Sequence, residues 1–202
     1  MGWTLGILGL IGLVLYLTIL DAWRVPGDDP SFNVAVAPTL RPGDTLLILK
    51  SSEVKLGHLV RCMDPDAPGR YVVGRIIAKA GDKIDVDELV TVNGKRNPSP
   101  HACSEPKVMM RHPGTQEDVR LSCVVEDTYG NEHEAIRDLD HPQATSKSVV
   151  EAGKVYLVSD NRHWHLDSRD FGQVDPATCQ HIVYRLWGES YFDASRRFNF
   201  LW

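Results

Sequence analysis

The feature that most constrains this chain is an uncharged apolar run near its N-terminus. Residues 3–20 contain no Asp, Glu, Lys or Arg, and an α-helix of that length approaches the thickness of the hydrocarbon core of a bilayer. A cleavable signal peptide is the alternative, but it needs a basic segment before the run and a small-x-small site soon after it. No Lys or Arg precedes the run, and Ala35-Val36-Ala37 lies far downstream, followed by Pro38. We therefore expect residues 1–22 to form an uncleaved transmembrane anchor, with the lipid bilayer as a partner.

The remaining residues have the composition of one globular domain with a modest insertion. The chain has 202 residues, of which 43% are hydrophobic and 24% charged, enough to bury a core. Its formal net charge is −5, so bulk charge gives no reason to expect a nucleic-acid partner.

Short apolar runs separated by Gly, Pro, Asn and Asp predict a mostly antiparallel β fold. The expected strands are residues 45–50, 59–63, 71–78, 83–86, 89–92, 155–158 and 182–187. From residue 96 to residue 149 the texture changes to Pro, Ser, His and charged residues, with one expected hairpin at 119–136. We predict a core made of residues 23–95 and 150–202, with residues 96–149 forming an inserted cap subdomain.

The cysteines and the C-terminal tail each leave two interpretations open. Cys103 and Cys123 flank one segment and are the likelier disulfide pair, but four separate thiols are as compatible with the sequence. The spacing shows no CxxC, which argues against zinc. The tail, residues 191–202, carries five aromatic residues and Arg196-Arg197. It either packs against the core or lies at a bilayer interface, where Trp and Tyr are favoured.

A dense group of ionisable residues follows the predicted strand at 155–158. His163, His165, Asp167, Arg169 and Asp170 fall within eight positions, after the turn-forming sequence at 159–161. Such a group indicates either a functional site or a buried polar brace.

Three blocks of sequence together resemble the type I signal peptidases of bacteria and mitochondria. The first block contains Pro38, Thr39 and Leu40 followed by Gly43 and Asp44. The second runs from residue 74 to residue 83 and contains Arg75 and a Gly-Asp pair, and the third contains Ser159-Asp160-Asn161-Arg162 and then Asp167-Ser168-Arg169. The resemblance implies a membrane-anchored serine protease fold that is rich in β structure and carries a Ser–Lys dyad.

The departures from this family pattern fall on the catalytic positions. The nucleophilic serine of the family corresponds to Ala35, the lysine base to Gly74, and the hydroxyl that orients the lysine to His165. Asn33 corresponds to the side chain of the oxyanion hole and could still donate a hydrogen bond. A methyl group and a hydrogen cannot act as nucleophile and base, so the resemblance predicts a pseudoprotease.

The residues that brace the site in the family are kept. Asp160, Asp167, Ser168 and Arg169 match the third block, where the resemblance implies supporting hydrogen bonds and an ion pair.

Two other chemistries remain open at this stage. A displaced nucleophile, Ser31, Ser159 or Ser168, could work with His165 as base, since histidine titrates near neutrality. Lys79 is the lysine nearest in sequence to position 74, where the family has its base. Because it lies an odd number of residues away, its side chain in a strand points to the opposite face, so we do not expect it to replace that base. His163, His165 and Asp167 form an HxHxD pattern that could hold zinc, but no other histidine stands at a recognisable spacing from it.

The leading hypothesis is therefore a signal-peptidase-like membrane protein without Ser–Lys catalysis and without cofactor or metal. It would bind a signal peptide or another membrane protein, or act as a structural subunit. The alternative is an active endopeptidase that uses a displaced nucleophile near His165. The resemblance places the folded part on the periplasmic side of a bacterial membrane, with the mitochondrial inner membrane as the second possibility.

Overall fold

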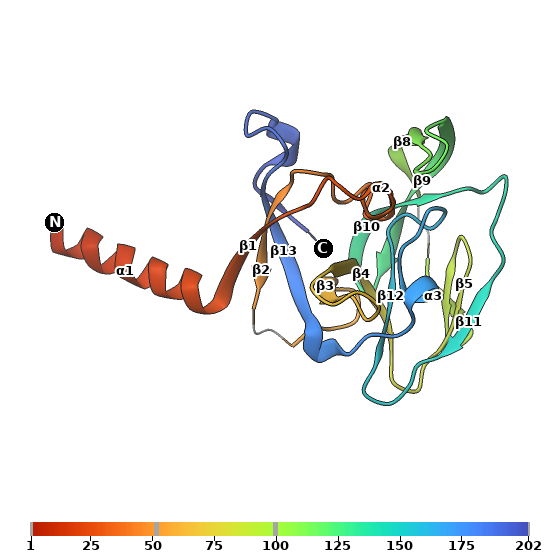
Figure 1. Ribbon diagram of the computed structural model, residues 1–202, viewed down its shortest axis with the longest axis horizontal. Coiled ribbons are helices and arrows are strands. Elements are labelled where there is room, and N and C mark those ends of the chain that lie inside the picture. The colour runs from red at the N-terminus through yellow and green to blue at the C-terminus, as the bar shows by residue number, and fades with distance from the viewer. Residues whose placement is uncertain (1, 51–52, 99–100, 202) are drawn as a thin grey trace.

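A computed structural model describes residues 2–50, 53–98 and 101–201 of the chain. The helix α1 (Gly2–Ile19) projects away from a body built of β-sheets, and it runs directly into the strand β1 (Leu20–Arg24) (Figure 1). Among the described residues, no helix combines the length and the apolar character needed to cross a membrane. The transmembrane anchor expected at residues 1–22 therefore stays a prediction.

The largest sheet has seven strands, all paired antiparallel, which confirms the predicted mostly antiparallel β class. Its order is β1, β2 (Thr45–Leu49), β13 (Cys179–Trp187), β3 (Leu59–Met63), β4 (Tyr71–Lys79) and β12 (Val155–Val158), and β14 (Asn199–Phe200) pairs with β13. The apolar runs of the sequence become its central strands, because β4 and β12 are buried along almost their whole length.

Two smaller sheets cover one end of this body (Figure 1). One contains β11 (Ser146–Val149), β5 (Lys83–Val86), β6 (Val90–Val92) and β7 (Lys95–Arg96). The other contains β10 (Asn131–Arg137), β9 (Asp118–Thr128) and β8 (His101–Arg111), all from the predicted insertion. Because β11 pairs with β5, the insertion ends by rejoining the core. The division into core and cap subdomain stays a prediction.

A short helix, α2 (Pro30–Ala35), lies in a region where the sequence predicted no helix or strand. Asp29 is its N-cap, and its Oδ1 accepts hydrogen bonds from the backbone N–H groups of Ser31 and Phe32, each at 3.0 Å. Pro30 occupies the first turn, where its missing N–H costs nothing. The helix buries Phe32 in the main apolar cluster, beside Val36 and Leu40.

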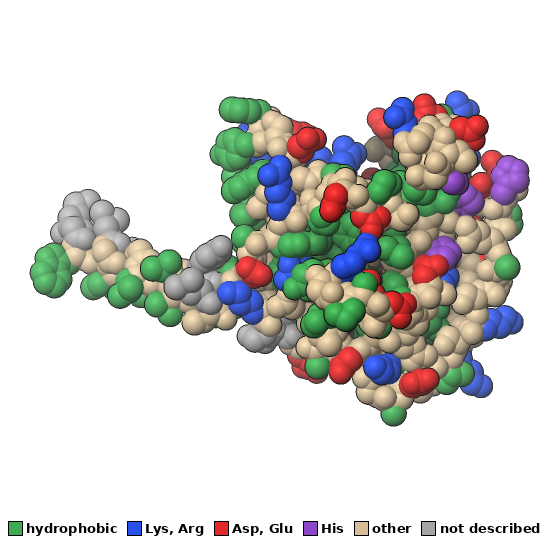
Figure 2. All heavy atoms as spheres, viewed as in Figure 1, with side chains coloured by type: hydrophobic (Ala, Val, Ile, Leu, Met, Phe, Trp, Pro, Cys, Tyr) green, Lys and Arg blue, Asp and Glu red, His purple; other side chains and the backbone are tan. Residues whose placement is uncertain are grey.

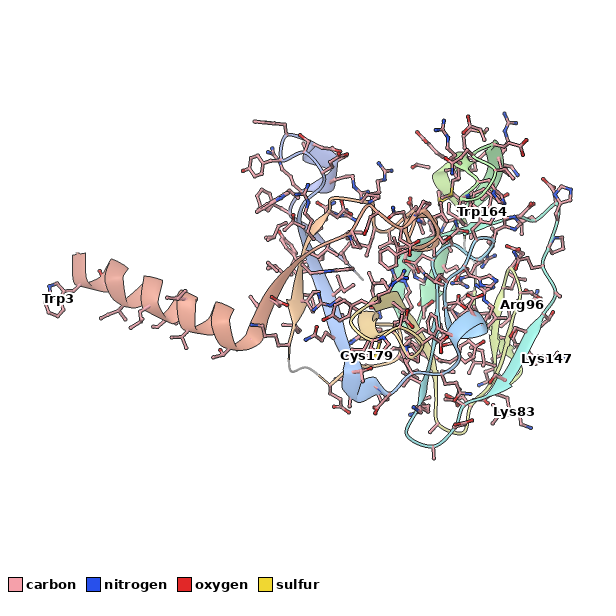
Figure 3. The ribbon with its side chains drawn as sticks, viewed as in Figure 1. Trp3, Lys83, Arg96, Lys147, Trp164 and Cys179 are labelled. Atoms are coloured by element: carbon pink, nitrogen blue, oxygen red, sulfur yellow. A yellow bond between two sulfur atoms is a disulfide. The ribbon has the colours of Figure 1, made fainter. Side chains whose placement is uncertain are left out.

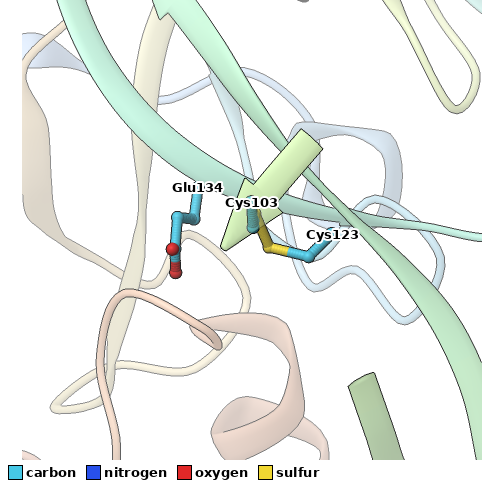
Figure 4. Close-up of side chains that lie close together, drawn as sticks. All are labelled: Cys103, Cys123 and Glu134. Carbon is cyan, nitrogen blue, oxygen red and sulfur yellow. A yellow bond between two sulfur atoms is a disulfide. The ribbon is translucent and has the colours of Figure 1, made fainter. Parts of the chain in front are cut away.

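Each of two disulfides joins a pair of strands. Cys103 and Cys123 link β8 to β9, as one of the two interpretations predicted, and the Glu134 side chain of β10 lies beside them (Figure 4). Cys62 and Cys179 link β3 to β13, where they are direct cross-strand partners (Figure 3). This second pairing spans 117 residues, so nothing local in the sequence indicates it.

The C-terminal tail leaves most of its aromatic rings exposed. Phe192 is 88% exposed and Tyr191, Phe198 and Phe200 are about half exposed or more, whereas Leu201 is buried in the core. Apolar side chains gather on this projecting tail and along α1 in the same view of the molecule (Figure 2).

Candidate functional site

Ala35 lies at the last position of α2, and its side chain is 1% exposed. The backbone N–H of Asn161 donates to Ala35 O at 3.2 Å, and Asn161 Nδ2 donates to Val34 O at 2.9 Å. Asn161 belongs to the segment 159–170, called here the motif loop, which follows β12. The motif loop thus holds the end of the helix that carries the vacant nucleophile position.

Gly74 lies in β4 opposite Val60 of β3. A Cβ atom at position 74 would meet Val158 O at 3.1 Å and Leu157 Cβ at 3.3 Å, both in β12. These contacts are tighter than ordinary van der Waals separations, so a lysine here would force the neighbouring strand to move.

His165 is held away from the serines that the sequence offered as displaced nucleophiles. Its Nδ1 lies 2.7 Å from Asp170 Oδ2, and its Nε2 lies 3.1 Å from Gln143 Oε1. Ser159 Oγ exchanges hydrogen bonds with the backbone of Leu166, at 3.2 Å, and Ser168 Oγ accepts from Leu157 N–H at 2.9 Å. Ser31 is exposed on α2. The hydrogen bonds of the described residues therefore do not join His165 to any of these serines.

Asn33, at the position of the oxyanion-hole side chain, already donates to a carbonyl of its own chain. Its Nδ2 bonds Gly27 O at 3.2 Å, and its Oδ1 is buried without a hydrogen-bond partner.

The first brace centres on Asp160, which is fully enclosed. Arg75 Nε donates to its Oδ1 at 2.8 Å and Arg75 Nη2 to its Oδ2 at 3.3 Å, while Thr39 Oγ1 donates to Oδ2 at 2.5 Å. Burial by itself raises the pKa of Asp160, but the charge of Arg75 and the hydrogen bonds from Arg75 and Thr39 lower it below the ordinary value. Asp160 is thus an ionised carboxylate that fixes the second sequence block against the first.

The second brace is built on Asp167, the N-cap of the helix α3 (Ser168–Phe171). Arg169 donates to it through Nε at 2.9 Å and Nη2 at 2.7 Å, and the Ser159 N–H donates to it at 2.8 Å. Asp170 Oδ2 accepts the Asp167 N–H at 2.9 Å, completing a capping box. Burial raises the pKa of Asp167, but Arg169 and the backbone donors lower it by more. The net pKa is below the ordinary value, so Asp167 stays charged.

The first sequence block is fixed in the same way. Asp44 accepts hydrogen bonds from Arg185 Nε at 3.1 Å and from Arg196 Nη2 at 2.5 Å. Arg185 lies in β13 and Arg196 in the C-terminal tail. Gly43 has a φ of +83°, and a Cβ there would meet Glu189 at 3.1 Å. Leu40 is fully buried, and Pro38 follows a cis peptide bond.

The insertion supplies residues that the sequence reasoning missed. Glu126 of β9 accepts from Arg162 Nη2 at 2.6 Å and also bonds Arg137, and its side chain is completely buried. The Ile136 N–H donates to Asp160 O at 2.8 Å, and Arg162 N–H donates to Ile136 O at 2.8 Å. The strand β10 therefore pairs directly with the motif loop. These residues match no motif, and only their contacts identify them.

The predicted HxHxD zinc pattern does not converge. His163 faces Glu88 and Asp138 instead of His165. His165, Asp167 and Asp170 do lie within 4.8 Å of one another, but the oxygens of both carboxylates are occupied by the capping box and by Arg169. In a second group of this kind, Cys103 and Cys123 are joined in a disulfide beside Glu134 (Figure 4).

A groove lies between the start of α2 and the turn that leads into β4. Its volume is about 580 Å³, and it is lined by Trp23, Pro26, Asp28, Asp29, Pro30, Phe32, Gly69, Arg70 and Tyr71. An ion pair between Asp29 and Arg70 connects its two walls. Beside the groove, the first residues of β4 pair with β3 on one edge, while β12 pairs with β4 only from Arg75 onward. Val72, Val73 and Gly74 are nevertheless buried, so this edge is not open to a peptide, whereas Tyr71 is exposed and lines the groove.

Comparison with known proteins finds the same likeness over most of the chain. The family model "Signal peptidase, peptidase S26" matches residues 2–183. Signal peptidase I V of Bacillus subtilis (strain 168) is 27% identical over 171 residues, which cover 82% of this chain and 87% of that protein.

Proposed function

Because the chain belongs to the signal peptidase family, peptidase S26, we propose that it is a membrane-associated member that binds an extended peptide and does not cleave it with a Ser–Lys dyad. The observation that carries this proposal is the combination of an intact scaffold with two vacant catalytic positions. Asp160 and Asp167 keep their arginine partners, while Ala35 and Gly74 offer neither a nucleophile nor a base.

The packing around the vacant positions supports a loss of catalysis that is more than a single exchange. A Cβ at position 74 would lie 3.1 Å from Val158 O and 3.3 Å from Leu157 Cβ, so a lysine there requires β12 to shift. The amide of Asn33 is turned to Gly27 O, and His165 is engaged by Asp170 and Gln143. Among the described residues, no hydrogen bond joins His165 to Ser31, Ser159 or Ser168, so the contacts do not favour a displaced Ser–His pair.

The groove beside α2 is the proposed peptide site. Its volume and its aromatic and proline lining suit a peptide side chain, and Asp28, Asp29 and Arg70 offer polar contacts alongside. The occupant that fits the family is a signal peptide or the membrane segment of another protein.

Membrane association is proposed on the apolar surface of α1 and of the tail. Trp3, Ile7 and Leu10 of α1 are at least half exposed, as is Phe192 of the tail, and exposed apolar surface of this extent marks an interaction site. Co-flotation of the full chain with liposomes tests this. A chain that lacks residues 1–19 should float less, and equal recovery of both chains in the lipid-free fraction would contradict the proposal.

The catalytic part is tested with the detergent-solubilised full chain and a preprotein that carries small residues at positions −3 and −1 of its cleavage site. We expect a labelled signal peptide to bind, binding to weaken several-fold in Tyr71→Ala, and the preprotein to remain uncut. Tyr129→Ala, a substitution of a half-exposed tyrosine away from the groove, is the matched control. Specific cleavage that disappears in His165→Ala would overturn the pseudoprotease proposal.

A further inference from the structure

Four side chains that the proposed function does not use meet where the insertion joins the core. Glu88 comes from the turn between β5 and β6, Asp138 and His141 follow β10, and His163 belongs to the motif loop. His163 Nδ1 lies 3.6 Å from Glu88 Oε1, and His163 Nε2 lies 3.9 Å from Asp138 Oδ2. The same Asp138 oxygen lies 3.3 Å from His141 Nδ1.

Two of these polar atoms are buried without a hydrogen-bond partner, namely Glu88 Oε1 and His163 Nδ1. The Glu88 side chain is only 4% exposed, and its other oxygen accepts the Asp138 N–H at 3.0 Å. A buried carboxylate oxygen and a buried imidazole nitrogen left unpaired are costly. These two atoms lie 3.6 Å from each other, just beyond hydrogen-bond distance, so neither is satisfied in the described structure.

The orientation of His163 matches that of a metal ligand. A metal-binding imidazole binds through one nitrogen and donates its other N–H to a carboxylate, which fixes the tautomer and the ring. Here Nε2 faces Asp138, and Nδ1 faces the unpaired oxygen of Glu88. We propose that Asp138, His141 and His163 bind a divalent cation of the zinc class, with Glu88 as the carboxylate that orients His163.

The ligand chemistry agrees with that metal. Two imidazole nitrogens and one carboxylate oxygen, with a fourth position open to water, form a common zinc set. Asp138 Oδ1 is held by the N–H groups of Asp140 and His141, each at 3.0 Å, which leaves Oδ2 as the ligand atom.

The geometry requires the three ligand atoms to move closer together, the two histidine nitrogens included. Ligand bonds of about 2.0–2.1 Å in a tetrahedral site place donor atoms roughly 3.3 Å apart. The Asp138–His141 separation already has this value, whereas Asp138 and His163 must approach by about half an ångström. The three ligand atoms do not yet lie together as a group in the described residues. His141 is the mobile member, because its side chain is 85% exposed.

The test uses the full chain in detergent, freed of metal by a chelator, and Zn²⁺ alone as the probe in a calorimetric titration. We expect one Zn²⁺ per chain, an affinity at least tenfold weaker in His141→Ala, and a 10–100-fold loss in Glu88→Gln. The matched control is His101→Ala, which removes an exposed histidine of β8 outside the cluster.

Binding of Co²⁺ provides a second readout, since a site with these ligands gives the visible absorption of tetrahedral cobalt. No binding, or an affinity that His141→Ala and Glu88→Gln leave unchanged, would overturn the proposal. Equal weakening by His101→Ala would also overturn it, because the metal would then be held by surface histidines in general. If Glu88→Gln fails to fold, His141→Ala decides the question, since its side chain lies at the surface.

Discussion

At position 74 the missing side chain is part of how two strands pack. Gly74 has no side chain to place against β12. A Cβ atom at this position would have Val158 O and Leu157 Cβ as its nearest neighbours. The sequence predicted the loss of a lysine at this position through the family resemblance. It could not predict how closely β12 approaches position 74, because that depends on contacts between residues more than 80 positions apart in the sequence.

We predict that Gly74→Ala destabilises the protein by about 1 kcal/mol. A Cβ there requires β12 to shift by a few tenths of an ångström, and the cost of shifting a buried strand outweighs the usual gain from replacing glycine. Urea unfolding measures the change, and Gly114→Ala is the control, since a Cβ there meets His112 only at an ordinary 3.4 Å. A Gly74→Ala variant as stable as the parent would show that β12 yields easily and that a lysine could return.

At the scale of single elements, β10 and β13 each carry a histidine whose pKa is lowered to about 4. Burial is the main cause for His133, followed by the charge of Arg75. Burial is also the main cause for His181, followed by His58, whose ring stacks on it at 3.7 Å. Both imidazoles are therefore neutral in the folded protein around neutral pH.

This lowering gives stability a definite pH dependence. Between pH of about 6.5 and about 4 the unfolded chain binds protons that the folded chain does not, so stability is full above pH 6.5 and falls as pH decreases. We expect the urea midpoint to fall between about pH 7.5 and about pH 5, and to fall less in His181→Gln. His101→Gln, at an exposed position, is the control. An unchanged slope in His181→Gln would contradict the assignment.

The two disulfides each link a pair of strands, and the loops of chain that they close differ in length. Cys62 and Cys179 are 117 residues apart, and Cys103 and Cys123 are 20 apart. In the chain-entropy account, removing the longer link costs about 1.5 kcal/mol more than removing the shorter one. Paired Cys→Ser variants of each disulfide, compared by urea unfolding, test this order. Equal losses would mean that native contacts, not loop closure, set the difference.

For the whole molecule, the decisive contact is the one between the insertion and the motif loop. Glu126 joins Arg162 of that loop to Arg137 of β10, and all three side chains are buried. We predict that Glu126→Ala costs about 3–5 kcal/mol, because it leaves buried arginine charge without its carboxylate.

Hydrogen exchange of residues 131–137 and 160–162 should accelerate together in Glu126→Ala, since β10 pairs with the motif loop. Glu132→Ala, an exposed neighbour on β10, is the control and should change stability by less than about 0.5 kcal/mol. A small loss in Glu126→Ala would show that the insertion is held to the core by other contacts.

The sequence by itself determined the β class, most strands and the family, because each is encoded by local periodicity or by a motif at fixed spacing. The two vacant catalytic positions, Ala35 and Gly74, stay predictions from the same motifs. It predicted the Asp160 and Asp167 braces by position. It missed α2, which depends on the cap of Asp29, and the roles of Glu126 and His133, which lie in a segment without motifs. Only the tertiary structure decided which groups meet. Such contacts join residues far apart in the chain and leave no local pattern. Examples are the Cys62–Cys179 disulfide, the close approach of β12 to Gly74, and the contact of Glu88 with His163.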